Sequence, residues 1–388
     1  MDPEPLAEAS STGSGMRKRP GVASQSDGGG PPRIESSDIW LEDGNFIIET
    51  TSQEARTLYK VHKSTLALNT IFFRTLFSGS QDAFISGSEQ YEGLHLMTMT
   101  DDADDVKEFL RALYFPQTLQ QHLPVADMKP KLYKIPPSYH SILRVATKLE
   151  CDAVRNSVIH ILQLVWPCIL SDWDVLQIGY NAHEGPIIIP NSPESVIPQI
   201  YPDPACIIQL AIDCNVPDLL PVAYYYLSCV YGWQPLEDAA VKIRTAKLQI
   251  LDASSLIRLV EGKARLMGAF MDTLDDIEDH FNVYQDWPCI RIADDLSLQC
   301  LPALQTKIHE IRPGGTQALT SLCDPLECLR EMVNAPVWHG DEICHPCRCQ
   351  AKKILSLKRR ELWMSLPKYF GLDDVLGPTS GWRQSPHV

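Results

Sequence analysis

Apolar and polar positions along the first part of the chain follow a strand period. The segment DIWLEDGNFIIET, which begins at Asp38, holds two apolar runs on either side of Asp43-Gly44. An Asp-Gly pair between such runs is typical of a β-hairpin, and Gly44 is the residue expected to take the positive φ of its turn. Residues 58–61 and 93–99 have the composition and alternation of two further strands.

Helical spacing appears between and after these strands. Leu66, Phe73 and Phe77 share one helical face, with Ser64 as the expected N-cap. A second helix shows the same spacing, at Val106, Phe109, Leu110 and Leu113. Four aspartates precede it, at positions 101, 102, 104 and 105. Acidic side chains at a helix start satisfy its first N–H groups, so we interpret them as capping residues rather than as a metal site.

The rest of the chain is predicted to be mainly helical. One helix is expected at residues 140–150, and Asp152 is expected to cap the next one. The organisation we predict is a disordered tail at 1–37, a mixed domain at 38–165, a helical domain at 166–375 and a flexible tail at 376–388. A proline-rich stretch near 181–204 is expected to be an insertion in the helical domain.

Composition narrows the class of partner. The chain has 388 residues, of which 44% are hydrophobic, and a formal net charge of -15. Phosphate groups are bound by Lys and Arg, so we expect no nucleic-acid or anionic-membrane binding. No apolar stretch reaches the ~20 residues of a membrane-spanning helix. The acidic start MDPEPLAEAS is unlike a secretory signal, so we expect an intracellular protein, cytoplasmic, nuclear or both.

The order of these elements resembles that of the BTB/POZ domain. The motifs that carry the resemblance are Asp38-Ile39-Trp40, YKVHKSTLALNTIFFRTLF from Tyr59, HLMTMTDDADDVKEFLRALY from His95 and ILRVATKLECDAVRNSVIHIL from Ile142. The remainder resembles the helical C-terminal region of a large fungal BTB group, through CNVPDLLPVAYYYLS from Cys214 and RRELWMSLPKYFGL from Arg359. The resemblance implies an α+β fold in which a small sheet caps a helical cluster, followed by a mostly helical domain.

The same resemblance implies protein partners and self-association. Asp38 and Lys63 match the acidic and basic positions that form a charged pocket near the dimer surface of BTB domains. Cullin binding in the family uses an apolar residue followed two positions later by Glu. Here Phe84 and Ile85 supply apolar anchors, but Ser86 and Gly87 stand where the Glu would be. We therefore expect weak or no cullin binding.

Cysteines offer the sharpest candidate chemistry. Cys344 and Cys347 have the CxxC spacing with which two thiolates meet one zinc ion, and Cys349 or His345 would be a third ligand. A fourth ligand would come from Cys323, Cys328 or His339. With no second CxxC in the chain, we expect thiols that hold no metal, and no cofactor. Other cysteines, at 206, 214 and 229, lie in apolar helical patterns and are expected to be buried thiols outside any disulfide framework.

A basic stretch lies near the C-terminus, with its charges at Lys352, Lys353, Lys358, Arg359 and Arg360. We interpret it as a solvated helix face. The chain contains no GxSxG, no HExxH and no phosphate-binding loop. We therefore predict a non-enzymatic protein-interaction scaffold. The alternatives are a substrate adaptor for a cullin-type ubiquitin ligase, and a zinc- or nucleic-acid-binding regulator.

Overall fold

The computed structural model describes residues 23–24, 31–52, 54–78, 89–120, 138–182, 203–229, 246–282, 297–311, 324–339, 342–377, 380 and 382. It is α+β, mostly helical with one small mixed sheet, which confirms the predicted fold class at that level. The chain divides into two compact units, namely Met1–Thr118 with Ser141–Arg155, and Leu119–His140 with Asn156–Val388. The division therefore falls after Arg155, ahead of the domain boundary predicted at residue 165.

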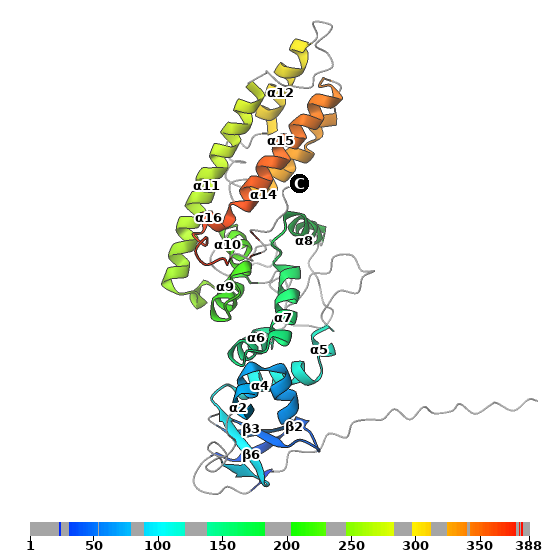
Figure 1. The fold of residues 1–388 in the computed structure, drawn as a ribbon. Helices are drawn as coiled ribbons and strands as arrows, with labels where there is room; N and C mark the ends of the chain where they lie inside the picture. The colour runs from blue at the N-terminus through cyan, green and yellow to red at the C-terminus, as the bar shows by residue number, and fades with distance from the viewer. Residues whose placement is uncertain are drawn as a thin grey trace, which may run out of the picture. The chain divides into compact units, whose positions relative to one another are not determined.

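The sheet belongs to the first unit, which we call the sheet unit (Figure 1). Its strands are β1 Ala23–Ser24, β2 Arg33–Trp40, β3 Phe46–Thr51, β4 Arg56–Val61, β5 Gln90–Tyr91 and β6 Leu94–Met99, in the order β1-β2-β4-β3-β6-β5. Strand β2 is parallel to β4, and β3 is antiparallel to β4 and parallel to β6. A buried cluster of Ile47, Leu58 and Leu96 packs across the central strands. The strands predicted at 58–61 and 93–99 are thus confirmed as β4 and β6.

The hairpin predicted at Asp43-Gly44 is wrong, because β4 lies between β2 and β3. Gly44 is needed for a different reason than a positive φ, which the described glycines adopt only at Gly93 and Gly371. A Cβ on Gly44 would lie 2.8 Å from Cγ of Lys60 and 3.0 Å from the Leu41 carbonyl oxygen. Glycine is therefore required where the chain passes close to β4.

The fold begins earlier than the boundary predicted at Asp38. Strand β2 starts at Arg33, whose Nε donates to Oε1 of Glu49 at 2.8 Å. Glu49 is only 2% exposed and also accepts a hydrogen bond from Thr98 Oγ1 at 3.1 Å. A buried carboxylate needs such partners, so Arg33 belongs to the folded unit rather than to a tail.

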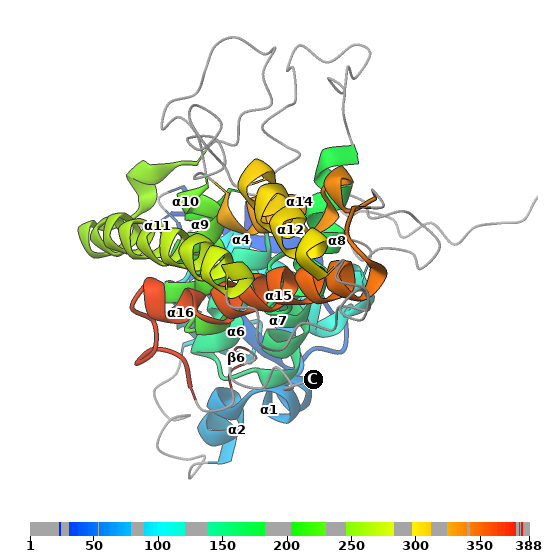
Figure 2. The same ribbon diagram turned by 90° about the horizontal axis from the view of Figure 1, so that it is seen from above.

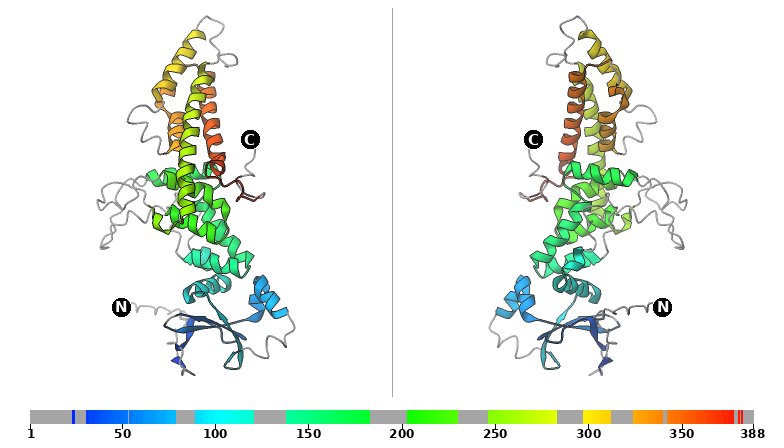
Figure 3. Two further views of the ribbon diagram at one scale, coloured as in Figure 1. Left: turned by 90° about the vertical axis from the view of Figure 1, so that its left-hand side faces the viewer. Right: turned by 90° about the vertical axis from the view of Figure 1, so that its right-hand side faces the viewer.

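Helices cover one side of this sheet (Figure 3). In the sheet unit they are α1 Lys63–Asn69, α2 Ile71–Ser78 and α4 Ala103–Tyr114, and a short helix α5 follows at Gln117–Gln120. Phe73 is fully buried, with its ring 6.1 Å from that of Phe46 in β3. Ser64 is not the N-cap of α1. The first N–H of that helix, on Lys63, donates instead to Oδ1 of Asn45 at 2.9 Å.

Helix α2 is closed at its start by residues from much later in the chain. The N–H of Ile71 donates to the Glu150 carbonyl at 3.3 Å, and that of Phe72 to the Leu149 carbonyl at 3.4 Å. Leu149 and Glu150 follow helix α6, Ser138–Lys148. The first N–H groups of a helix have no acceptor within the helix, so these two carbonyls supply the acceptors for the start of α2.

The capping interpretation of the acidic run is confirmed at Asp102. Its side chain is the N-cap of α4 and accepts from the Asp104 N–H at 2.9 Å. Two neighbouring aspartates pair with α6 instead, Asp101 with Lys148 and Asp105 with Arg144. Capping and ion pairing therefore account for this run.

The second unit, which we call the helical unit, holds most of the helices. They include α7 Asp152–Val165, α8 Leu170–Ala182, α9 Pro204–Asp213, α10 Leu220–Ser228, α11 Ala253–Asn282, α12 Ser297–Ile311, α14 Pro325–Asn334, α15 His345–Met364 and α16 Leu366–Tyr369. Short 3-10 turns occur at Pro217–Leu219, Leu248–Ile250 and Pro336–His339. Helices α11, α12, α14 and α15 lie side by side as a bundle (Figures 1 and 2).

Tyr224, through its ring, and Tyr225, through its hydroxyl, hold the core of the helical unit together. The ring of Phe370 stacks on Tyr224 at a centroid distance of 5.5 Å and passes over Gly262 of α11. The buried Tyr225 hydroxyl donates to Asp324 Oδ1 at 2.5 Å and accepts from the Leu326 N–H at 3.1 Å. Burial, reinforced by the Asp324 carboxylate, raises the pKa of Tyr225 well above its usual value.

None of the described helices alone is long and apolar enough to cross a membrane. Helices α7 and α8 would reach that length and composition only as a pair, which is bent by 62°.

Candidate functional site

Asp38 and Lys63, the residues expected in a charged pocket, form no ion pair with each other in the described part of the chain. The ammonium of Lys63 lies 5.7 Å from the ring centroids of both Phe46 and Phe77. Asp38 is exposed and accepts a hydrogen bond from Ser37 Oγ at 3.3 Å. A charged pocket formed by these two residues near a dimer surface stays a prediction.

An apolar surface lies close by in sequence, where α1 turns into α2. We call Leu68, Ile71 and Phe72 the α1–α2 corner, and their exposed fractions are 75%, 43% and 37%. The corner is held in shape from inside, because buried Thr70 makes hydroxyl hydrogen bonds to the backbone on both sides of it. The Arg74 guanidinium also donates to two carbonyls at the end of α1. These apolar side chains are therefore presented on a fixed backbone.

Phe84 and Ile85, the apolar anchors considered for cullin binding, lie outside the described residues. The prediction of weak or no cullin binding stays as the sequence makes it.

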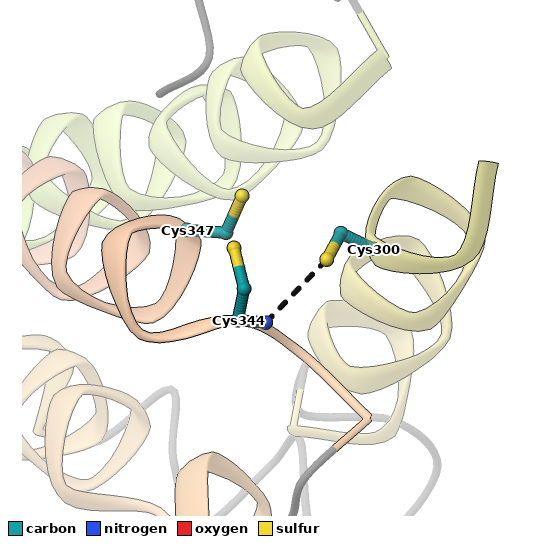
Figure 4. Close-up of side chains that lie close together, drawn as sticks. All are labelled: Cys300, Cys344 and Cys347. Atoms are coloured by element: carbon teal, nitrogen blue, oxygen red, sulfur yellow. Dashed lines mark hydrogen bonds between the residues drawn. The ribbon is translucent and has the colours of Figure 1, made fainter. Parts of the chain in front are cut away.

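Three cysteines come together in the helical unit, and we call them the cysteine cluster. Cys344 is the N-cap of α15, Cys347 lies in the first turn of that helix, and Cys300 lies in α12 (Figure 4). Their Sγ atoms all lie within 4.8 Å of one another. Their exposed fractions are 1% for Cys300, 5% for Cys344 and 1% for Cys347. The Cys344 N–H donates to the sulfur of Cys300 at 3.4 Å.

The third thiol of this cluster differs from the one that the sequence suggested. Cys349 is exposed, and its sulfur lies 3.6 Å from Nε2 of His345 rather than beside Cys344 and Cys347. Among the described residues, the group able to hold a metal includes neither of these two, nor Cys328 or His339. Cys323 lies outside the described part of the chain. Cys300 thus stands beside the CxxC pair, where the sequence suggested Cys349 or His345.

Nothing in the local sequence distinguishes Cys300 as a member of this cluster. It is a single cysteine in the segment LSLQCLPALQ, 44 residues before Cys344. An isolated cysteine in an apolar helical pattern is typical of a buried structural thiol. Only the packing of α12 against the start of α15 identifies it as a cluster member.

Of the remaining described cysteines, Cys151, Cys214, Cys229 and Cys328 are buried, whereas Cys206 and Cys349 are exposed. Within the described residues every cysteine is a thiol outside any disulfide, as expected. Cys214 and Cys229 are buried as predicted, but Cys206 is exposed because it faces outward from α9. Burial, with a contribution from the Asp218 carboxylate, raises the pKa of Cys168 to about 12, which keeps that thiol protonated and unreactive.

The interpretation of the basic stretch as a solvated face is wrong for Arg359. This guanidinium is 7% exposed and forms a two-pronged ion pair with Asp174. Its Nε also donates to the Leu326 carbonyl at 2.8 Å. Lys358 pairs with Asp276 at 3.2 Å. Lys358 and Arg359 therefore form ion pairs within the helical unit.

No family model, curated protein or solved structure matches the chain. Two features of the described residues are candidate sites, namely the α1–α2 corner and the cysteine cluster.

Proposed function

We propose that this chain is a non-enzymatic protein-interaction protein, in which the sheet unit is a BTB/POZ-type domain that joins two copies of the chain. The observation that carries the proposal is the α1–α2 corner, with Leu68 three-quarters exposed beside Ile71 and Phe72. Single exposed apolar residues are ordinary on protein surfaces. Here three exposed apolar side chains lie together where α1 meets α2, on a backbone held in place by Thr70. Such a group is a candidate binding anchor.

Rigidity favours this use of the corner. Association costs conformational entropy whenever an interface must be ordered first. Here the backbone at the corner is already ordered by Thr70 and Arg74. A second copy would bury the apolar side chains against its own, and the nearby charges of Asp38 and Lys63 would add specificity.

Polar groups of the sheet unit support a structural rather than a catalytic use. The Tyr59 hydroxyl donates to the Ala103 carbonyl at 2.6 Å, and burial raises the pKa of Tyr59 to about 12. Nε2 of His62 lies 3.0 Å from Oδ1 of Asp43, and the Tyr114 hydroxyl accepts from the His62 N–H at 2.9 Å. These partners are backbone groups and neighbouring side chains, which is the pattern of a fold-stabilising network.

The proposal is tested by the mass of the full chain in solution. We expect sedimentation velocity at tens of micromolar to give a dimer, and Leu68→Asp to weaken dimerisation by about 30-fold. That factor corresponds to the ~2 kcal/mol typical of a central interface residue. The matched control is Leu357→Asp in α15, since Leu357 is 52% exposed but lies in the helical unit.

A monomer at these concentrations, or equal losses for Leu68→Asp and Leu357→Asp, contradicts the proposal. Submicromolar binding of a cullin N-terminal domain by a chain that stays monomeric would favour the adaptor function instead.

A further inference from the structure

We propose that Cys300, Cys344 and Cys347 form a zinc-binding site that joins α12 to the start of α15. The CxxC pair alone did not support this, because two thiols are too few for a stable site. The structure adds a third buried thiol from another helix, with all three sulfurs within 4.8 Å. This inference is independent of the interaction function proposed for the sheet unit.

The spacing of the three sulfurs fits one ion. Zinc holds thiolate sulfur at about 2.3 Å, so two ligands of a tetrahedral site lie about 3.8 Å apart. The observed limit of 4.8 Å exceeds this by about an ångström, which small rotations of the three side chains remove. Figure 4 shows the sulfurs of Cys344 and Cys347 next to each other, with that of Cys300 facing the Cys344 backbone from α12.

Two backbone features beside the cluster would stabilise thiolate sulfur that is bound to a metal. Cys344 and Cys347 stand at the N-terminus of the 20-residue helix α15, where the helix dipole is positive. A backbone N–H, that of Cys344, points at the sulfur of Cys300 at 3.4 Å. Hydrogen bonds of this kind from the backbone stabilise thiolate ligands around a metal. On binding, each thiol gives up its proton to solvent and its sulfur donates an electron pair to the ion.

Ligand type identifies the metal class. Thiolates select zinc over magnesium and calcium, which prefer oxygen ligands. The described part of the chain brings no other His, Cys, Asp or Glu into this group. Three thiolates leave the fourth tetrahedral position to a ligand from outside this group.

The first test uses the unaltered full chain, purified under reducing conditions and stripped of metal. We expect it to bind one Zn²⁺ per chain, measured by elemental analysis after gel filtration. Co²⁺ in place of Zn²⁺ should give the sulfur-to-cobalt charge-transfer absorption of thiolate ligands. Absence of that absorption overturns the proposal without any variant. So does a Cys344–Cys347 disulfide found by alkylation and mass spectrometry in freshly reduced protein that takes up no metal.

The second test assigns the ligands. We expect Cys300→Ser and Cys347→Ser each to weaken Zn²⁺ affinity by more than about 100-fold, since even partners outside the ligand shell are worth about 10–100-fold. The matched control is Cys349→Ser, which alters the same CxxCxC segment at an exposed cysteine outside the cluster. It should bind Zn²⁺ as the unaltered chain does. Equal loss in Cys349→Ser, or full retention in Cys300→Ser, overturns the assignment. Circular dichroism of the metal-free variants separates loss of a ligand from loss of the fold.

Discussion

At the scale of single residues, the buried hydroxyl of Tyr225 contributes to the stability of the helical unit. It donates to Asp324 and accepts from the Leu326 N–H, so it links α10 to the start of α14. We expect Tyr225→Phe to lower the free energy of unfolding by about 2 kcal/mol, because it leaves a buried N–H without its acceptor. Denaturant unfolding of the full chain, followed at the helical signal, measures the change.

Asp324→Asn is the control for that change. Asparagine keeps an oxygen that accepts from Tyr225 and from the Glu327 N–H, which Asp324 caps at 3.1 Å. The loss should therefore be smaller than that of Tyr225→Phe. A Tyr225→Phe protein as stable as the parent would show that the hydroxyl has no net stabilising effect.

Arg359 and Cys300 differ in whether their surroundings could be predicted from the sequence. Arg359 could have been identified as buried, since Leu355 and Leu362 lie on the same helical face of α15. Its charge in a basic run led to the opposite interpretation. Cys300 could not have been identified, because its partnership depends on how α12 packs against a helix 44 residues later.

At the scale of secondary-structure elements, α11 contains two glycines with opposite expected behaviour. A Cβ on Gly262 would lie 2.1 Å from Cδ1 of the buried Phe370 ring. A Cβ on Gly268 would meet no described atom within 4 Å. We expect Gly262→Ala to destabilise the chain by about 1–3 kcal/mol through overpacking. Gly268→Ala should stabilise it by about 0.5–1 kcal/mol, because alanine is the better helix former.

Thermal unfolding of the two variants beside the parent measures this contrast. Both changes add one methyl group to the same helix, so helix propensity cancels in the comparison. Equal shifts of the midpoint for both would show that Phe370 does not pack tightly on α11.

Elements were predicted well where neighbouring residues decide the structure, and poorly where distant parts of the chain decide it. The aspartates ahead of α4 act on the helix that directly follows them, and Asp102 caps it as expected. The Asp43-Gly44 pair also had a clear local signal, but strand pairing is decided by the whole sheet. Strand β4 takes the position beside β2 that a hairpin would have given to β3.

At the scale of the whole molecule, the start of the folded part can be measured. A chain lacking residues 1–30 keeps the Arg33–Glu49 ion pair, whereas a chain lacking residues 1–35 loses it. We expect the second chain to be less stable than the first by about 2 kcal/mol, because buried Glu49 keeps only a longer ion pair with Arg56, at 3.9 Å, and the Thr98 hydrogen bond. Calorimetry of both proteins gives the difference.

Arg33→Met in the chain lacking residues 1–30 is the control for the loss of strand β2 itself. It removes the charge and keeps the backbone, so it should reproduce most of the loss. Matching midpoints for the two shortened chains would restore the boundary predicted at Asp38.

The closing of α2 by Leu149 and Glu150 bears on how the protein is made. Ribosomes release the chain from its N-terminus, and N-terminal domains generally fold first as they emerge. The sheet unit cannot do so at Thr118, because the carbonyls that complete α2 come from beyond α6. The sheet unit lacks residues 141–155, which pack with it, until Arg155 has left the exit tunnel. Until then we expect the nascent sheet unit to expose apolar surface, as folding intermediates do, and so to be prone to aggregation.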